Sequence, residues 1–233
     1  MALRALIFDV DGTIADTERA GHLPASNQAI RALGYSFQWT WEEFKSLYHL
    51  PGTADRFRYA LEHQETPPPP DEIDRLVREF GRIKQQVYIE EYLPQLPLRA
   101  GVEALMQSAV ENEVQLAIVS TTYEAQIHAL LDNQLAGHRE YFWPVLGKET
   151  GTKTAPDSPL YRKCLEMLAF TPDEVLVIED SEPGLRAALN AGLPCAVIYN
   201  GHTFGGDFRH AVLVARSLAP FSLHQLEALC LPE

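Results

Sequence analysis

Two aspartates separated by one residue follow a mostly apolar run near the start of the chain. Residues 3–8 favour a strand, and Asp9, Asp11, Gly12 and Thr13 come directly after it. In a parallel sheet, the carboxyl ends of the strands line the ligand crevice, which would place both carboxylates at its floor. Carboxylates this close repel each other, and Mg²⁺, which prefers oxygen ligands, would relieve the repulsion. The alternative is a strand that ends in a solvated acidic turn.

Hydroxyl groups and a lysine occur further along the chain at positions that could serve a phosphate. Ser120 and Thr121 follow the apolar residues 114–119, and a hydroxyl there could donate to a phosphate oxygen. Ser120 taken alone is equally well explained as a helix N-cap. Lys153 could neutralise phosphate charge, although a single lysine is more often solvated. These residues can form a phosphate site only if the fold brings them close together.

A second acidic pair ends a later apolar run. Residues 175–178 are all aliphatic, and Glu179 and Asp180 follow them directly. The chain therefore uses the same arrangement twice, an apolar strand that runs into carboxylates. This repetition favours a built site over a chance acidic turn.

The elements that must position these residues alternate between helical and strand-like segments from residue 98 onward. The strand candidates are residues 114–119, 143–146, 175–178, 195–199 and 211–214. Such alternation predicts a doubly wound parallel sheet. The fold class we expect is α/β, with a Rossmann-like parallel sheet core that includes the first strand.

The stretch between the first strand and this alternating region is helical in character. Thr40 and Glu43 form a capping box pattern, and the prolines of residues 67–70 make a stiff connector. Beyond them, apolar residues recur at helical spacing at positions 73, 76, 77, 80, 83 and 87. We therefore expect an α/β core domain of residues 1–16 and 96–233, with residues 17–95 inserted as an all-helical cap domain.

The motifs together resemble those of the haloacid dehalogenase (HAD) superfamily. Asp9-Val10-Asp11-Gly12-Thr13 is similar to its DxDGT signature, and the later motifs are matched in order by Ser120, Lys153-Thr154-Ala155-Pro156-Asp157 and Glu179-Asp180-Ser181. The helical insert and the Glu179-Asp180 ending resemble the β-phosphoglucomutase branch. Within that branch, Asp16-Thr17-Glu18-Arg19-Ala20-Gly21-His22 and Asp207-Phe208 are similar to CbbY-type sugar phosphatases.

The resemblance, with the residue types, implies a role for each group of the core. Asp9 would attack phosphorus and form an aspartyl-phosphate, and Asp11 would act as general acid and then general base. Mg²⁺ would be held by Asp9, the main-chain carbonyl of Asp11, Asp180, and Glu179 either directly or through water. Ser120, Thr121 and Lys153 would contact the phosphoryl group of the substrate.

In the same branch the helical insert closes over the site and contacts the substrate. His22 and Arg56 are the candidate substrate-binding residues of the cap, with ordinary surface roles as the alternative. The stretch Gly52-Thr53-Ala54-Asp55-Arg56 parallels a glycine-rich loop in which relatives usually carry Gly-Gly-Lys before the arginine. The loss of that lysine leaves the preference for a bisphosphate open.

Composition restricts the partners and the compartment. The chain of 233 residues has a net charge of −13, which disfavours nucleic acid and anionic membranes as partners. Three cysteines without metal-like spacing, and a first strand too early for a signal peptide, indicate a cytoplasmic protein. We expect a monomer that acts on a small phosphorylated metabolite.

Three functions fit these residues. The first is a Mg²⁺-dependent phosphatase that hydrolyses a small phosphorylated sugar, such as a pentulose bisphosphate, through an aspartyl-phosphate. The alternative with the same chemistry is a phosphomutase of the β-phosphoglucomutase type, which returns the phosphoryl group to a sugar. A non-catalytic phosphometabolite-binding protein is the third, but a binder has no need of a nucleophile.

Overall fold

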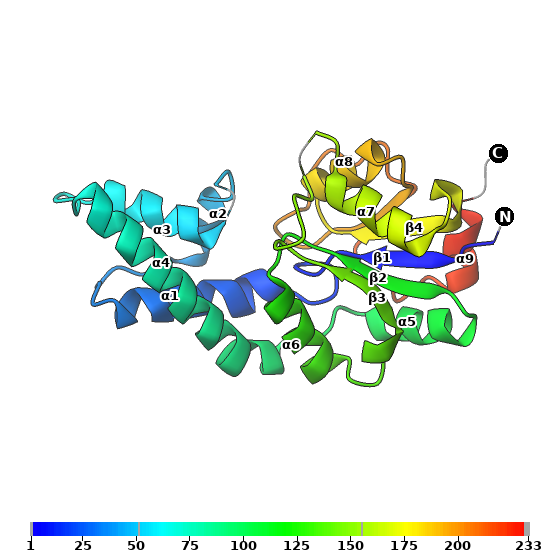
Figure 1. Cartoon of the computed structure of the whole chain (residues 1–233), viewed down its shortest axis with the longest axis horizontal. Coiled ribbons are helices and arrows are strands. Elements are labelled where there is room, and N and C mark those ends of the chain that lie inside the picture. Colours follow the sequence, from blue (N-terminus) through cyan, green and yellow to red (C-terminus); the bar gives the residue numbers. More distant parts are fainter. Residues whose placement is uncertain (1, 51, 155, 231–233) are drawn as a thin grey trace. The chain divides into compact units, whose positions relative to one another are not determined.

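The chain folds into two compact units. The computed structural model describes residues 2–50, 52–154 and 156–230. One unit consists of Met1–Asp16 and Pro97–Glu233, and we call it the α/β unit; the other, Thr17–Leu96, is the helical unit (Figure 1). Among the described residues, no helix has both the length and the apolar character needed to cross a membrane.

One parallel sheet runs through the α/β unit. Its strands, as far as the described residues show, are β1 (Ala5–Phe8), β2 (Gln115–Val119), β3 (Phe142–Leu146), β4 (Val175–Glu179), β5 (Cys195–Ile198) and β6 (Leu213–Ala215). They are ordered β3-β2-β1-β4-β5-β6, and every neighbouring pair is parallel. The predicted doubly wound α/β fold is thereby confirmed. The strand bounds differ from the expected ones by one or two residues, which is the usual uncertainty at element ends.

Helices cover both faces of this sheet. Figure 1 shows α7 (Pro159–Leu168) and α8 (Glu182–Asn190) on one side, and α5 (Val102–Glu111) and α6 (Glu124–Gln134) on the other. A short helix, α9 (Leu223–Ala228), contacts α5. Because both faces are covered, β1 and β4 are buried along their whole length, which explains why β1 is entirely apolar and β4 is apolar up to Glu179 at its end.

The layer between the sheet and α7 and α8 is a tightly packed apolar core. Alternate strand residues point into it, as the period of two requires, and they include Ile7, Val119, Val177 and Val197. The buried ring of Tyr161 on α7 belongs to the same core. This packing fixes the strand ends from which the site is built.

The helical unit contains four α-helices in its described part. These are α1 (Leu23–Ala32), α2 (Trp41–Ser46), α3 (Thr53–Glu62) and α4 (Pro70–Val87). A π-helical turn at Glu18–His22 leads directly into α1, and a second one at Tyr88–Tyr92 follows α4, before a 3₁₀ turn at Leu93–Gln95. The unit is therefore all-helical, as the sequence predicts.

Local sequence signals set the ends of these helices. The capping box at the start of α2 is present, since Glu43 N donates to Thr40 Oγ1 at 3.3 Å and Thr40 N donates to Glu43 Oε2 at 2.8 Å. The last residue of the proline run, Pro70, is the first residue of α4, where proline is tolerated because its missing N–H has no helical partner.

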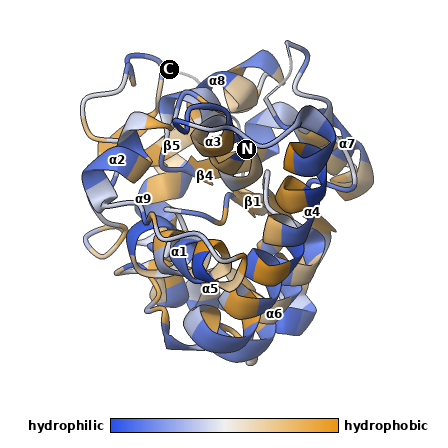
Figure 2. Cartoon of the chain, turned by 90° about the vertical axis from the view of Figure 1, so that its left-hand side faces the viewer, coloured by the Kyte–Doolittle hydropathy of each residue, from blue (hydrophilic) through white to orange (hydrophobic). Residues whose placement is uncertain are grey.

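Aromatic side chains hold the helical unit together. The rings of Phe57 on α3 and Phe80 on α4 stack with their centroids 4.4 Å apart, and Trp39 and Phe44 pack nearby. Helix α4 carries both hydrophilic and hydrophobic residues, as a helix with one buried face must (Figure 2). Lys84 lies on the buried face, which the apolar spacing alone does not anticipate.

Candidate active site

Four charged residues from three segments meet at the carboxyl edge of the sheet. Asp9 follows β1, Glu179 ends β4, Asp180 comes next, and Lys153 lies in the loop before α7. All four are buried, with exposed fractions between 1% and 5%. Carboxylate oxygens of Asp9, Glu179 and Asp180 lie within 4.8 Å of one another. We call these four residues the acidic cluster.

Lys153 is the central cation of the acidic cluster. Its Nζ donates to Asp9 Oδ1 at 2.6 Å and forms a second, very short ion pair with Glu179 Oε1. Burial by itself would lower the pKa of Lys153, but the charges of Asp9 and Glu179 outweigh it and raise the pKa. The interpretation of Lys153 as a solvated surface lysine is therefore wrong. Ala155, in the same motif, is outside the described residues.

Asp9 has both carboxylate oxygens engaged. Oδ1 accepts from Lys153, and Oδ2 accepts from Thr13 Oγ1 at 3.2 Å. Burial raises the pKa of Asp9 to about 7, with Lys153 opposing the rise and Glu179 adding to it. An ionised, reactive Asp9 at neutral pH therefore depends on positive charge in its surroundings.

Glu179 is held by its neighbours in one orientation. Tyr161 Oη donates to its Oε1 at 2.9 Å, and the main-chain N of Asp180 donates to its Oε2 at 3.2 Å. A Cβ at Gly184 would lie only 2.0 Å from Oε2, so glycine is needed at the start of α8 for the carboxylate to fit. The sequence analysis did not select Tyr161. The one feature that could have drawn attention to it is its position, as an aromatic residue shortly after the motif that contains Lys153.

Asn200 is a second residue that sequence reasoning misses. It lies two residues beyond the end of β5, and its Nδ2 donates to Asp180 Oδ2 at 2.7 Å. Its Oδ1 accepts from the main-chain N of His202 at 3.0 Å, which fixes the amide. A polar residue just after a strand of the parallel sheet is the signal that could have found it. Burial, followed by the charges of Asp9 and Glu179, raises the pKa of Asp180.

The loop after β2 supplies the hydroxyl groups. Ser120 is buried, and its Oγ accepts from the main-chain N of Thr122 at 3.2 Å. Helix α6 begins at Glu124 with Tyr123 as its N-cap, so the alternative of Ser120 as an N-cap is wrong. Thr121 is exposed, whereas Thr122 is buried and donates to Asp11 Oδ2 through a very short hydrogen bond. Thr122, which the sequence analysis did not choose, is the threonine that contacts a candidate catalytic residue.

The donor atoms of the acidic cluster fit a hard divalent cation. Its oxygen ligands come from carboxylates, which Mg²⁺ prefers, and the pKa values of Asp9 and Asp180 are raised chiefly because these groups are buried. A bound cation would favour their ionised forms. The candidate metal site therefore lies at Asp9, Glu179 and Asp180, with the main-chain carbonyl of Asp11 as the further ligand expected from the sequence.

His22 and Arg56, the two residues of the cap that were expected to bind substrate, lie in the helical unit. Each is 7% exposed. The ring of His22 stacks on Tyr88 with centroids 4.3 Å apart, and its Nδ1 lies 2.9 Å from Lys84 Nζ. A charged lysine can only donate, so a charged Lys84 would make Nδ1 of His22 the acceptor. Lys84 is a buried cation of this unit that the sequence analysis overlooked.

Arg56 is buried among aromatic rings rather than among carboxylates. Its guanidinium lies 4.7 Å from the ring centroid of Phe44 and 4.5 Å from that of Tyr48. Nη1 is 4.0 Å from Glu18 Oε2, an ion pair too long for a hydrogen bond. Within the described part of the chain, Nε and Nη1 have no hydrogen-bond partner. Burial lowers the pKa of Arg56, and the charge of Glu18 opposes this.

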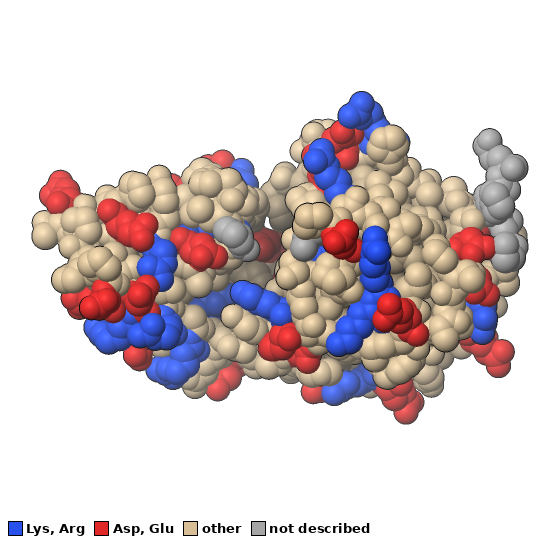
Figure 3. All heavy atoms as spheres, turned by 45° about the horizontal axis from the view of Figure 1, so that its top comes forward, with Lys and Arg blue, Asp and Glu red and all other residues tan. Residues whose placement is uncertain are grey.

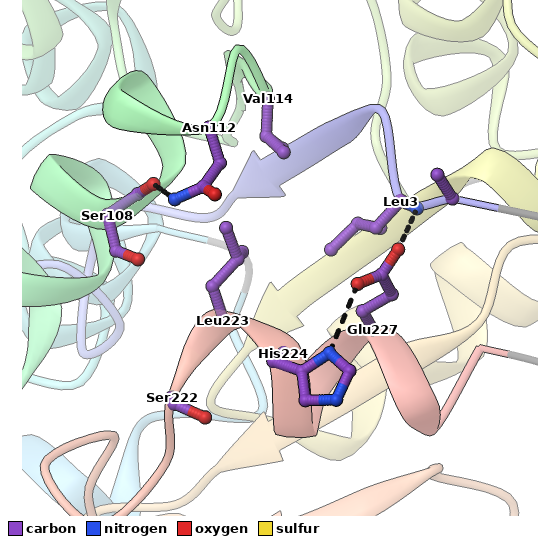
Figure 4. Close-up of a pocket in the computed structure, with 9 residues that line it drawn as sticks. Leu3, Ser108, Asn112, Val114, Ser222, Leu223, His224 and Glu227 are labelled. Atoms are coloured by element: carbon purple, nitrogen blue, oxygen red, sulfur yellow. Dashed lines mark hydrogen bonds and ion pairs between the residues drawn. The ribbon is translucent and has the colours of Figure 1, made fainter.

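A surface pocket of about 360 Å³ lies elsewhere on the α/β unit (Figure 4). It is formed by the ends of α5 and α9 and the segment before β1, with Leu3, Asn112, Leu223 and Glu227 among its lining residues. Glu227 accepts a hydrogen bond from Leu3 N at 3.2 Å, so this carboxylate is used in the packing of the chain terminus. The pocket is lined by none of the candidate site residues.

On the face shown in Figure 3, the Lys and Arg side chains of the described residues are interspersed with Asp and Glu.

The chain belongs to the haloacid dehalogenase-like hydrolase family, whose model matches residues 6–198. That span includes all four members of the acidic cluster, and the match confirms the resemblance inferred from the motifs. The family is thus established by the sequence as well as by the fold.

More particularly, the chain is similar to CbbY proteins. It is 32% identical to Protein CbbY of Cereibacter sphaeroides, over 93% of each chain. It is also 32% identical to the CBBY-like protein of Arabidopsis thaliana, over 89% of this chain and 66% of that protein. A crystal structure of a CbbY mutant from Rhodobacter sphaeroides in complex with xylulose-(1,5)bisphosphate matches with a TM-score of 0.82 and 30% identity, covering 97% of this chain and 99% of that one.

Proposed function

We propose that this protein is a Mg²⁺-dependent phosphatase that hydrolyses a small phosphorylated sugar through an aspartyl-phosphate on Asp9. The observation that carries the proposal is the buried Lys153, whose ammonium lies between Asp9 and Glu179. A cation in this position would reduce the repulsion between the Asp9 carboxylate and a phosphate dianion. Similarity to CbbY, which has been crystallised with a pentulose bisphosphate, makes that class the first substrate to test.

Asp9 attacks the phosphorus atom and expels the sugar oxygen. The repulsion to be overcome is about 1 kcal/mol for two unit charges 4 Å apart in water, and about 4 kcal/mol at an effective dielectric constant of 20. Lys153 and Ser120 would contact the transferring phosphoryl oxygens, with Thr121 beside them. Positive charge and hydrogen-bond donors placed there stabilise the transition state more than the substrate.

Asp11 carries the proton in both halves of the reaction. It protonates the departing sugar oxygen and then takes a proton from the water that hydrolyses the aspartyl-phosphate. Thr122 donates to its Oδ2 and so holds the carboxyl group in one orientation. This contact assigns Thr122 a positioning role that the sequence did not suggest.

Mg²⁺ would be held by Asp9, Asp180, the main-chain carbonyl of Asp11, and Glu179 directly or through water. Bound there, it would neutralise charge shared by the nucleophile and the phosphoryl oxygens. Asn200 would keep Asp180 oriented toward the cation, because it occupies Oδ2.

Residues 17–95 would act as the cap of this enzyme, with the α/β core formed by residues 1–16 and 96–233. His22 and Arg56 would contact the part of the substrate that does not react. The open donors of Arg56 suit a second anionic group of the substrate, and Lys84 adds a further buried cation near His22. These contacts would exclude water and select the sugar.

A phosphomutase remains the alternative, because the same Asp9 chemistry can return the phosphoryl group to a sugar hydroxyl. The test supplies the protein and Mg²⁺ with a pentulose bisphosphate or with a hexose 1-phosphate and a trace of its bisphosphate. Inorganic phosphate and isomeric sugar phosphate are followed together. We expect inorganic phosphate to form first, and isomer appearing well ahead of it would identify a mutase. Tight binding without either product would indicate a binding protein.

A further inference from the structure

The guanidinium of Arg99 joins three segments of the α/β unit through their main-chain carbonyls. Its Nη1 donates to the carbonyl oxygens of Gly12 and Ile198. Its Nη2 donates to the carbonyl oxygens of Tyr199 and Arg216, and both of these Nη2 hydrogen bonds are 2.8 Å long. These acceptors belong to the loop after β1, the end of β5 and the segment after β6. A side chain outside the four motifs therefore reaches directly into the first of them.

Gly12 is held on both sides of its Cα atom. Its carbonyl accepts from Arg99, and its N–H donates to the carbonyl of Ala15 at 2.8 Å. Its φ of +81° favours glycine, and a Cβ there would lie 2.4 Å from Asp180 Oδ2. The backbone of Gly12 thus lies against a carboxylate of the acidic cluster and has little freedom to rotate.

This restraint fixes the direction of the Asp11 carbonyl. The carbonyl of Asp11 and the N–H of Gly12 belong to the same peptide group, which is planar and trans, so they point in opposite directions. Because the N–H points at Ala15, the Asp11 carbonyl points away from it. A main-chain metal ligand needs such a defined direction, since Mg²⁺ demands near-ideal octahedral geometry.

We propose that Arg99 is a positioning residue of the metal site. By holding the Gly12 carbonyl, it acts with the Ala15 contact to fix the two peptide groups that flank the Gly12 Cα, so that the Asp11 carbonyl keeps its direction and the Gly12 backbone stays against Asp180. This inference rests on the proposed Mg²⁺-dependent function.

A purely structural role is the competing explanation, because Arg99 also ties β5 to the segment after β6. The chain offers a matched control for that role. Ser217 Oγ donates to the carbonyl of Ala100 at 3.0 Å, so it joins the segment that carries Arg99 to the segment after β6, as the Arg99 contact to Arg216 does, without touching Gly12. Removing the Ser217 hydroxyl therefore tests that link alone, whereas changing Arg99 tests it together with the contacts to β5 and to the first motif.

The experiment measures Mg²⁺ binding by titration calorimetry in the absence of substrate, for the wild type, Arg99→Lys and Ser217→Ala. The melting temperature of each protein is recorded in EDTA. Lysine keeps the charge but cannot reproduce the planar fork that reaches four carbonyls. We expect the Mg²⁺ dissociation constant to rise by about 10-fold or more in Arg99→Lys, as for other residues that orient metal ligands, and to stay unchanged in Ser217→Ala.

The outcomes separate this inference from the proposed function. If Arg99→Lys melts earlier but binds Mg²⁺ as tightly as the wild type, Arg99 is only structural and the phosphatase proposal stands. If the wild type itself binds no Mg²⁺, the metal assignment is wrong and both proposals fall. Arg99→Gln, which removes the charge and the planar fork, provides a second variant if Arg99→Lys does not fold, and we expect the same loss of Mg²⁺ affinity in it.

Discussion

The two units bury their cations in opposite ways. In the α/β unit, Lys153 lies between two carboxylates and both of its ion pairs are short. In the helical unit, Arg56 lies over the rings of Phe44 and Tyr48, and two of its nitrogens have no hydrogen-bond partner among the described residues. The first cation is paired with two carboxylates of the protein, whereas the second keeps donors that the described residues do not use.

This difference predicts different roles for the acidic cluster and for Arg56. A buried donor without a partner costs roughly 1–3 kcal/mol, so a site that keeps one gains when a ligand supplies the acceptor. The acidic cluster, by contrast, contains the proposed nucleophile Asp9 already paired with its counter-charge, Lys153. We therefore expect changes in the acidic cluster to affect every substrate, and changes at Arg56 to depend on which substrate is offered.

The largest effect should come from Asp9→Asn. The amide keeps the shape of the side chain and can still accept from Lys153, but it is a far weaker nucleophile and a poorer metal ligand. We expect turnover to be lost for every phosphate ester while the circular dichroism spectrum is unchanged. Residual phosphate release above about one thousandth of the wild-type rate, from protein free of wild-type contamination, would contradict the role of Asp9.

Lys153→Ala should have the next largest effect, again on all substrates. Removing one charged contact to a transition-state oxygen typically lowers kcat by about 10²–10³-fold. Ser120→Ala is the comparison, since a neutral hydroxyl contact is worth about half as much, and we expect roughly a tenfold loss. Steady-state kinetics with saturating Mg²⁺ measures both. Equal small losses in the two variants would mean that Lys153 only balances the buried acids.

Sequence patterns anticipated the acidic cluster because each member is tied to a strand end or a motif. Asp9 and the Glu179–Asp180 pair directly follow apolar runs, and parallel strands bring their carboxyl ends to one edge. The parallel direction of the strands also follows from the alternation of elements. The spacing of residues in the sequence does not show that Lys153 is buried. In the folded chain it lies between two acidic residues and is not a surface lysine.

The contacts that hold the site depend on turn geometry, which the sequence does not reveal. Nothing in Ser120-Thr121-Thr122 shows which hydroxyl points inward, and the inward threonine is Thr122. Asn200 and Arg99 act through loops far from the motifs. In the helical unit, Lys84 occupies a position on the apolar face of α4, where a charged residue breaks the pattern and could have been noticed.

Arg56→Ala should show the selectivity that separates the two units. With a sugar bisphosphate, we expect kcat/KM to fall by about tenfold or more, because a charged contact to the distal group is lost. With a small aryl phosphate the loss should be slight. Arg58→Ala is the matched control, since Arg58 lies on the same helix but pairs with Asp74 at the surface. Equal losses on both substrates would place Arg56 in stability or in general chemistry.

The smallest effect concerns the stability of the metal-free protein between pH 5 and pH 8. Burial raises the pKa of Asp9 from 3.8 to about 7, so in this range the folded protein retains a proton that the unfolded chain has released. The unfolded state then binds fewer protons, and the free energy of unfolding must fall as the pH rises toward and through 7. Each pH unit between the two pKa values is worth about 1.4 kcal/mol, and the fall extends over about two units from pH 5, so the loss is about 2.5 kcal/mol.

For a chain of this size, that loss corresponds to a melting temperature lower by about 5 °C at pH 8 than at pH 5 in EDTA. Mg²⁺ should reduce the decrease, because the cation prefers the ionised carboxylates. Asp9→Asn is the control that subtracts the contribution of every other ionisable group: its melting temperature should change less with pH than that of the wild type. Parallel pH profiles for the two proteins would show that Asp9 does not hold its proton in the folded state. The contrast between the units would then rest on the geometry of Lys153 and Arg56 alone.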